Sequence, residues 1–273
     1  MLDIIEHDHG IREFRLARPP VNALNPALIA TLKQAVERAP TNGATALILS
    51  GSQGLFSAGL DIPALLQLDR DAMRAFWRDF FGLCAALARS PIPVAAAVTG
   101  HSPAGGAVLA IFCDYRVMAR GEFRIGLNEV QVGLIVPDCI QAALRRLVGP
   151  YRAERLLVSG AMLDADDALA AGMVDELTDV DHVVTRTLAW LAPLLQLPRH
   201  AMLATRAMAR ADLARLFDDP ASLPVEAFLD GWFAPEAQTT LHALVERLRN
   251  RRSAEVEPHG SRRKASPKPF QPN

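Results

Sequence analysis

The chain has 273 residues, half of them apolar, which is enough to bury a core as one large domain or two small ones. Its formal net charge is −1, so the body has no electrostatic reason to bind nucleic acid or a membrane surface. The cysteines, Cys84, Cys113 and Cys139, lie among apolar neighbours without metal-site or disulfide spacing, and we expect buried thiols of a reducing compartment.

The opening sequence MLDIIEHDHG lacks the basic and apolar regions of a targeting segment. No run of the chain approaches the length of a membrane span. We therefore expect a cytoplasmic protein with no membrane partner.

The first half of the chain follows an α/β pattern. Residues 2–6 and 12–16 alternate as two strands of a hairpin, and Asn25 followed by Pro26 predicts the start of a helix over 27–39. Residues 45–50 then form a short apolar strand, which completes the strand-helix-strand unit that is typical of α/β folds.

Two histidines, His7 and His9, share one face of the first predicted strand. A protein metal site normally needs at least a third ligand, and none is nearby in the sequence. We therefore predict no metal site at this hairpin.

The loop over 51–63 is rich in small residues and follows a predicted strand. Asp61 and Pro63 can open another helix at its end, and its backbone N–H groups can stay free for a ligand. An ordinary strand-to-helix connection is the alternative interpretation. Residues 71–89 carry apolar side chains at helical spacing, which predicts a core helix.

A second glycine-containing turn lies between an apolar strand over 93–99 and a buried helix over 107–112. Pro103 suits the first position of this helix, because its missing N–H needs no partner there. Gly105 and Gly106 allow a ligand to approach the backbone donors at the helix start.

Ser102 raises the alternative of a serine hydrolase, since residues 100–106 resemble the nucleophile turn G-x-S-x-G. That turn uses the backbone N–H of the residue after the serine, and Pro103 has none. No convincing aspartate and histidine pair follows in the sequence. The sequence therefore disfavours this chemistry.

Glu129 lies after a predicted strand over 114–119 and has the apolar neighbours Leu127, Val130 and Val132. An acid in such surroundings is paired, exposed on a turn, or placed there for chemistry. The local sequence leaves these three interpretations open.

The remainder of the chain is predicted to be helical up to residue 251. Apolar stripes on these helices must be buried against the body or another subunit; the segments are 137–147, 152–158, 164–171, 181–194, 198–217, 222–233 and 235–251. Residues 252–273 are rich in proline and include the basic cluster 262–264, so we expect a disordered, solvated tail. Nucleic-acid or lipid binding by this tail is the alternative.

Four segments together resemble the crotonase, or enoyl-CoA hydratase/isomerase, superfamily. They are RPPVNALN, FSAGLDI, GHSPAGGAVLAIFCDYR and IGLNEVQVGLIVP. Within the superfamily they are most similar to the mitochondrial-type Δ3-Δ2-enoyl-CoA isomerases. The resemblance implies an α/β fold, the ClpP-like spiral of ββα repeats, over residues 1–195. It also implies a helical trimerisation region over 196–251, and hence a homotrimer or hexamer.

The resemblance also implies the site residues. The N–H groups of Leu60 and Gly105 would bind the thioester oxygen, and Glu129 would be the acid–base residue. Asn128 would lie beside the acyl chain. The coenzyme A moiety would be held by RPPVNALN and by the loop Ala58, Gly59, Leu60, Asp61 and Ile62.

Hydratases of this superfamily use a second glutamate, at the position that is Val108 here. Hydration needs a water held between two carboxylates, whereas a double-bond shift needs one base that moves a proton from C2 to C4. We therefore expect an isomerase that converts 3-enoyl-CoA to 2-enoyl-CoA in fatty acid degradation. The coenzyme A thioester is its substrate, and no cofactor is expected.

Two alternatives remain open from the sequence. One is another crotonase-type reaction on an acyl-CoA, such as weak hydration or thioester hydrolysis, because the superfamily changes chemistry with few residues. The other is a non-catalytic oligomer that binds acyl-CoA or, through its basic tail, nucleic acid.

Overall fold

The computed structural model describes residues 1–219 and 223–256. Its chain begins with the predicted hairpin, in which β1 (Leu2–Glu6) pairs antiparallel with β2 (Ile11–Leu16). Helix α1 (Pro26–Arg38) follows and starts at the predicted cap, where the Asn25 side chain accepts a hydrogen bond from the Leu28 N–H at 2.9 Å. The strand β3 (Ala46–Ser50) then pairs in parallel with β2.

Pairs of consecutive strands alternate between two sheets. The first members, β3, β5 (Val94–Val98) and β7 (Tyr115–Ala119), lie in a six-stranded sheet of order β1-β2-β3-β5-β7-β10. The second members, β4 (Gly54–Leu55), β6 (Gly100–Pro103) and β8 (Arg124–Gly126), lie in a four-stranded sheet of order β4-β6-β8-β9. The last strands are β9 (Leu163–Asp164) and β10 (Glu176–Thr178).

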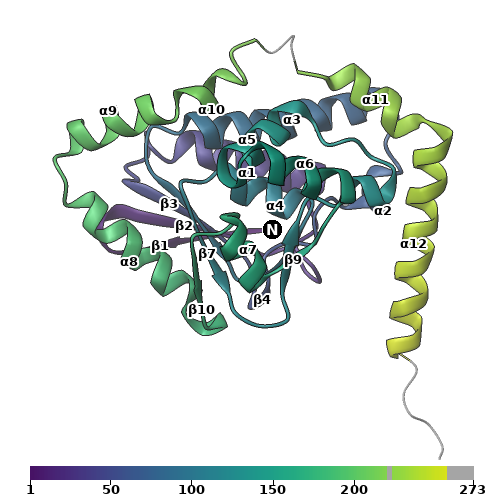
Figure 1. Cartoon of the computed structure of the whole chain (residues 1–273), viewed down its shortest axis with the longest axis horizontal. Coiled ribbons are helices and arrows are strands. Elements are labelled where there is room, and N and C mark those ends of the chain that lie inside the picture. The colour runs from purple at the N-terminus through teal and green to yellow at the C-terminus, as the bar shows by residue number, and fades with distance from the viewer. Residues whose placement is uncertain (220–222, 257–273) are drawn as a thin grey trace, which may run out of the picture.

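Each of these strand pairs leads into helix, so the chain advances as a spiral of ββα repeats (Figure 1). Helices α2 (Ile62–Leu65) and α3 (Arg70–Arg89) follow β4, and α4 (Gly105–Ile111) follows β6. The short 3-10 helix η2 (Glu129–Val132) and α5 (Asp138–Val148) follow β8. All seven residues of α4 are buried, which places this helix in the middle of the core. The predicted α/β class is confirmed.

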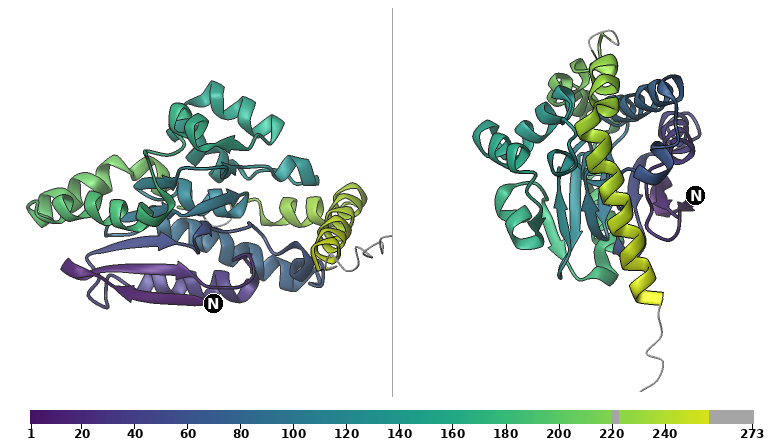
Figure 2. Two further views of the ribbon diagram at one scale, coloured as in Figure 1. Left: turned by 90° about the horizontal axis from the view of Figure 1, so that it is seen from below. Right: turned by 90° about the vertical axis from the view of Figure 1, so that its right-hand side faces the viewer.

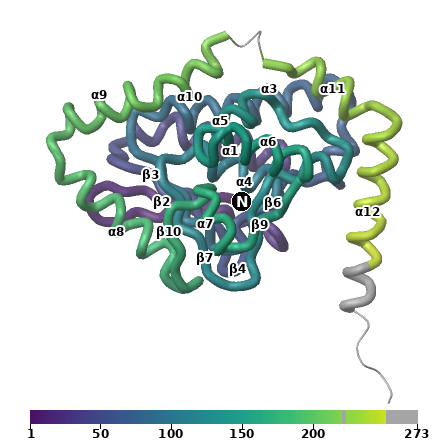
Figure 3. The backbone as a smooth tube through the Cα atoms, viewed as in Figure 1, coloured from purple at the N-terminus to yellow at the C-terminus, as the bar shows by residue number. Residues whose placement is uncertain are grey.

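The rest of the chain is mainly helical. Its helices are α6 (Pro150–Ser159), α7 (Ala165–Ala171), α8 (Val183–Leu195), α9 (Arg199–Ala209), α10 (Ala211–Arg215), α11 (Val225–Phe233) and α12 (Pro235–Val256). In Figure 3 the chain passes from α8 and α9 on one side of the molecule, past α10 and α11, to α12 on the other side. Figure 2 shows α12 on the outside of the molecule.

The helix after β6 does not start where the sequence predicted. Pro103 is the last residue of β6 and not the first of α4, because β6 pairs in parallel with β8 and sets Pro103 opposite Gly126. Ala104 then turns the chain with φ 45° and ψ −117°, and α4 begins at Gly105. A pairing partner more than twenty residues away therefore overrides the local preference of proline.

Two predicted helix limits also change. The segment 198–217 is not one helix but two, because Arg210, with φ −108° and ψ 8°, interrupts it between α9 and α10. Helix α12 continues to Val256 instead of ending at residue 251, so residues 252–256 of the predicted tail are helical. The rest of that prediction, 257–273, lies outside the described residues. Among the described residues, no helix is both long and apolar enough to cross a bilayer.

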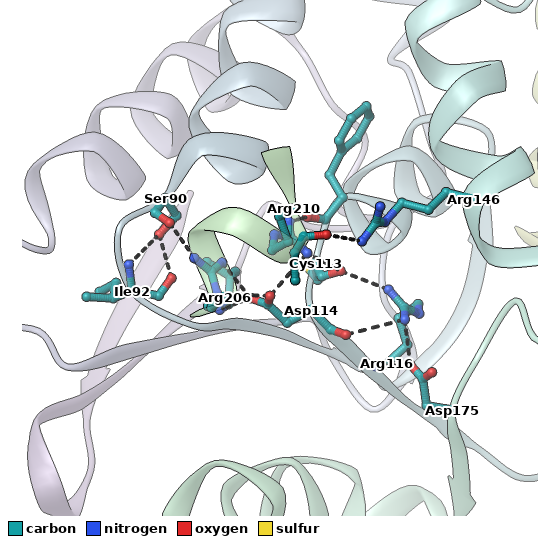
Figure 4. A network of polar contacts seen from close by, with 12 residues as sticks. Ser90, Ile92, Cys113, Asp114, Arg116, Arg146, Asp175, Arg206 and Arg210 are labelled. Atoms are coloured by element: carbon teal, nitrogen blue, oxygen red, sulfur yellow. Dashed lines mark hydrogen bonds and ion pairs between the residues drawn. The ribbon is translucent and has the colours of Figure 1, made fainter. Parts of the chain in front are cut away.

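A buried ion-pair network ties the C-terminal helices to the core (Figure 4). Asp114, just after α4, receives two hydrogen bonds from Arg206 of α9, at 3.0 Å from Nε and 2.7 Å from Nη2. Arg210 lies 3.1 Å from the same carboxylate and donates a 2.7 Å hydrogen bond to the carbonyl of Phe112. The arginines thus neutralise Asp114 and satisfy a free carbonyl at the C-terminus of α4.

Asp114→Asn tests this network. The substitution leaves two guanidinium groups, whose side chains are 11% and 10% exposed, without a full counter-charge. We expect the free energy of unfolding to fall by about 3 kcal/mol. Urea denaturation of the variant and the wild type measures this loss. Asp218→Asn is the matched control, because the pair of Asp218 with Arg89 is exposed and should contribute less than about 1 kcal/mol. Equal effects of the two substitutions would contradict a structural role for the buried network.

Candidate active site

The backbone N–H of Leu60 is aimed by a short parallel bridge to Leu24. The Leu24 N–H donates to the carbonyl of Gly59 at 2.8 Å, and the Asp61 N–H donates to the carbonyl of Leu24 at 3.0 Å. The C=O and N–H of a trans peptide point in opposite directions, so the Leu60 N–H points away from Leu24. Within the described residues it donates no hydrogen bond.

The N–H of Gly105 is aimed by the start of α4. The carbonyl of Ala104 accepts a hydrogen bond from the Val108 N–H at 2.9 Å, so the Gly105 N–H points backwards, out of the helix. This N–H, too, has no acceptor in the part of the chain that is described. The positive φ of Ala104, 45°, which costs on the order of 1–3 kcal/mol in a non-glycine residue, produces this orientation.

These two donors are neighbours. A Cβ atom added at Gly105 would lie 3.6 Å from the Leu60 nitrogen and only 2.8 Å from Cδ1 of Leu24. A Cβ atom added at Gly59 would lie 3.5 Å from the Gly105 nitrogen. The structure therefore brings Leu60 and Gly105 together, and a larger residue at position 105 would require the Leu24 side chain to move. Two adjacent free N–H groups are suited to bind one oxygen atom that carries negative charge.

Glu129 is the first residue of η2 and lies close after β8. Strands β6 and β8 run parallel in register, so Glu129 leaves the sheet at the same end at which α4 begins. Its residue surface is only 9% exposed, and its Oε2 has no hydrogen-bond partner among the described residues. Burial raises the pKa of Glu129 to about 7, an effect that a backbone hydrogen bond partly offsets.

A carboxyl group with a pKa near neutrality can both take up and release a proton at physiological pH. Of the three interpretations that the sequence left open for Glu129, the structure excludes pairing with another described side chain and exposure on a turn. A buried, unpaired acid of this kind is typical of a catalytic site.

The other residues predicted to contact the substrate differ in their exposure to solvent. Ala58 is exposed, Asn128 is half-buried at the start of η2, and Ile62 is buried. Gly59 is buried against Ala104. The Asp61 side chain is already engaged within the protein, because one oxygen caps α2 and the other pairs with Arg18.

Sequence reasoning missed how the segment 18–24 builds this site. Asn22 has a positive φ of 48° and donates from its side chain to the carbonyl of Phe56 at 3.2 Å. The Ser57 hydroxyl donates to the carbonyl of Asn22 at 2.8 Å and accepts from the Gly59 N–H at 3.1 Å. These contacts join parts of the chain that are far apart in sequence, and no local pattern signals them.

Two alternatives considered from the sequence find no support in the structure. The Ser102 hydroxyl is fully buried and contacts no base, while the His101 ring accepts a hydrogen bond from the Arg124 N–H. His7 pairs with Glu13 at 2.8 Å. Residues 1–219 and 223–256 contain no group of three or more histidine, cysteine or acidic side chains that could hold a metal ion.

Residues 6–249 match the model of the enoyl-CoA hydratase/isomerase family. The chain belongs to this family. It is therefore a member of the crotonase superfamily of enzymes, whose α/β spiral the strand pairs and helices reproduce. The superposition on the crystal structure of human mitochondrial delta3-delta2-enoyl-CoA isomerase has a TM-score of 0.87 at 29% identity. It covers 92% of this chain and 98% of the human one.

Relatives with two different names are similar to this chain. Human mitochondrial enoyl-CoA delta isomerase 1 is 29% identical over 88% of this chain and 80% of its own length. The probable enoyl-CoA hydratase EchA17 of Mycobacterium tuberculosis is 34% identical over 73% of this chain and 77% of its own length. These similarities show that the chain is an enzyme of this family. They do not distinguish isomerisation from hydration, so the site residues must decide between the two reactions.

The raised pKa of Glu129 predicts a pH-dependent stability. The folded protein holds the proton up to about pH 7, whereas the unfolded chain releases it near its ordinary pKa of 4.5. Raising the pH through this window therefore favours unfolding. Relative to Glu129→Gln, we expect the wild type to lose about 2 to 3 kcal/mol of unfolding free energy between pH 5 and pH 8.

Urea denaturation of both proteins at pH 5, 6, 7 and 8 measures this difference. The exposed Glu122 serves as the control site, because Glu122→Gln should follow the wild type at every pH. A constant difference between the wild type and Glu129→Gln would mean that Glu129 is not protonated at neutral pH.

Proposed function

We propose that this enzyme is an isomerase that shifts the double bond of a 3-enoyl-CoA to give the 2-enoyl-CoA, as a step of fatty acid degradation. The observation that carries the proposal is a buried carboxyl group without a side-chain partner, Glu129, at the end of the sheet where α4 begins with the free N–H of Gly105. Helix α4 has no acidic residue, and Val108 occupies the position that is a glutamate in hydratases. The similarity to human mitochondrial enoyl-CoA delta isomerase 1 supports the same choice.

The proposed reaction begins with proton removal. The Glu129 carboxylate takes a proton from C2 of the 3-enoyl thioester, and the electron pair of that C–H bond moves to form a dienolate. Its negative charge rests on the thioester oxygen, to which the N–H groups of Leu60 and Gly105 donate. Each such donor contributes about 3 kcal/mol to the stability of the transition state. Protonated Glu129 then returns the proton to C4, which leaves the double bond between C2 and C3.

Val108 contributes by keeping water away from the substrate. Its side chain is 1% exposed and apolar, so it offers no hydrogen bond to a water molecule near the substrate. Hydration of a 2-enoyl-CoA would need such a water between two acids. The reaction proposed here consumes no water and uses no cofactor beyond the coenzyme A of the substrate.

We also propose that the enzyme works as a homotrimer or hexamer. No residue of helix α9 is fully buried within its own chain, and Met208 is 79% exposed, although methionine, leucine and alanine make up more than half of the helix. An apolar helix of this kind is normally covered by another subunit.

Glu129→Gln should abolish isomerisation and leave acyl-CoA binding intact, because glutamine keeps the shape of the side chain but cannot accept the proton. Removal of a general base costs about 100- to 10,000-fold in kcat. The conjugation of 3-hexenoyl-CoA, followed by its absorbance, measures turnover, and calorimetry with hexanoyl-CoA measures binding.

Glu122→Gln is the control and should keep full activity, since Glu122 is exposed on the loop before β8. The same preparations are incubated with 2-hexenoyl-CoA to follow hydration and thioester hydrolysis. Full isomerase turnover in Glu129→Gln would refute its role. Hydration by the wild type that exceeds isomerisation would favour the hydratase alternative.

The pH dependence of kcat/KM should follow the ionisation of Glu129. The base must be deprotonated in the free enzyme, and burial raises its pKa to about 7. Activity should therefore rise about tenfold for each pH unit below pH 6 and level off above pH 8. Initial rates between pH 5 and pH 9 measure this profile, and a midpoint near the ordinary glutamate pKa would contradict it.

A further inference from the structure

An ion pair lies directly beside the proposed oxyanion site. Nη2 of Arg18 is 2.6 Å from Oδ2 of Asp61, and the two side chains are 25% and 13% exposed. Oδ1 of Asp61 accepts a hydrogen bond from the Ala64 N–H at 3.1 Å. Both carboxylate oxygens are thus used inside the protein, so Asp61 has little capacity left to bind a ligand.

Both the backbone and the guanidinium group of Arg18 are fixed by hydrogen bonds. Its N–H donates to the Asn22 side chain at 2.9 Å, and its carbonyl accepts from the Asn22 N–H at 2.8 Å. Its Nη1 donates to the carbonyl of Ala23 at 3.0 Å. The guanidinium group therefore links the segment that ends at Leu24 to the loop that contains Leu60.

The Arg18–Asp61 pair lies beside the Leu24–Leu60 bridge, which sets the direction of the Leu60 N–H. Leu24 holds the peptide groups on both sides of Leu60 through the carbonyl of Gly59 and the N–H of Asp61. Further hydrogen bonds join the same two segments before Leu60: the Ala58 N–H donates to the carbonyl of Val21 at 3.0 Å, and the Ser57 hydroxyl donates to the carbonyl of Asn22 at 2.8 Å. The Arg18–Asp61 pair adds a charge-assisted connection on the other side of Leu60, one residue away from it.

We propose that Arg18 and Asp61 are positioning residues that fix the direction of the Leu60 N–H toward the thioester oxygen. The inference rests on the proposed function in so far as this N–H receives that oxygen. It assigns to Asp61 a role different from the direct substrate contact that the sequence resemblance implied. A carboxylate is also a poor partner for the phosphate groups of coenzyme A, because both are negative.

The size of the effect follows from the sensitivity of such sites to geometry. A donor must lie within about 0.5 Å of its productive position, and a displacement of about 1 Å costs on the order of 100-fold in rate. Loss of the pair should therefore lower kcat by about 10- to 100-fold. The KM should change by less than about threefold, because a contact stabilising only the transition state contributes little to substrate binding.

The test uses the variants Arg18→Met, Arg18→Lys and Asp61→Asn in the full chain. Asp61→Asn keeps the cap of α2 but removes the negative charge of the pair. Arg18→Lys keeps the positive charge and should therefore recover part of the activity. Lys33→Met is the matched control, since the Lys33–Asp79 pair is similarly half-buried and joins α1 to α3 away from the site. It should retain wild-type kcat.

Two measurements separate positioning from other roles. The first is kcat and KM for 3-hexenoyl-CoA and for 3-hexenoyl-pantetheine, which lacks the nucleotide phosphates. The second is the absorption maximum of bound 2,4-hexadienoyl-CoA, which moves to longer wavelength when hydrogen bonds polarise its carbonyl group. We expect Arg18→Met and Asp61→Asn to reduce both kcat and this spectral shift, with both thioesters affected alike.

Each outcome decides the proposal. Unchanged kcat and an unchanged shift in both variants would overturn it, and so would a KM that rises only for the coenzyme A thioester, which would make Arg18 a phosphate contact. The absence of any shift in the wild type would also overturn it. A wild type that shifts the spectrum but does not isomerise would refute the proposed reaction. In that case, loss of the spectral shift in Arg18→Met and Asp61→Asn would support their role in positioning the Leu60 N–H.

Discussion

The close approach of two backbone segments at Gly105 is the constraint on which the candidate site depends. A Cβ atom at this position would lie 2.8 Å from Cδ1 of Leu24 and 3.6 Å from the Leu60 nitrogen. The backbone of Leu24 in turn holds the peptide groups on both sides of Leu60 through two hydrogen bonds. Three separate parts of the spiral therefore meet at Gly105: the segment after the hairpin, the loop after β4 and the start of α4. The ββα repeat brings them together, because each repeat delivers its second strand to the same small sheet.

The features that the sequence predicted well are those determined by near neighbours. The Asn25 cap and the buried face of α3 follow from residues within one or two helical turns. The burial of Glu129 was one of three interpretations that the local sequence left open, and the structure decides between them. The position of Glu129 relative to Leu60 and Gly105 came from the resemblance to a family, since no local pattern relates residues so far apart.

The features that the sequence did not predict depend on distant partners. Pro103 lies in a strand because β8 pairs with it, and the pairing of Arg18 with Asp61 requires the loop after β4 to fold back on the segment before α1. Likewise, Arg206 and Arg210 could not be matched to Asp114 without knowing that α9 and α10 return to the end of α4. In each case the tertiary contact decides the local conformation.

The ion-pair network at Asp114 has a consequence for how the chain folds. Arg206 lies in α9 and Arg210 between α9 and α10, yet their counter-charge and several of their acceptors lie at the end of α4. A fragment that stopped at residue 195 would lack these cations, so Asp114 would lose two ion pairs and the carbonyl of Phe112 would lose a donor. The segment after residue 195 thus contributes to the stability of the spiral. During synthesis, α4 reaches its final electrostatic environment only after α10 has emerged from the ribosome.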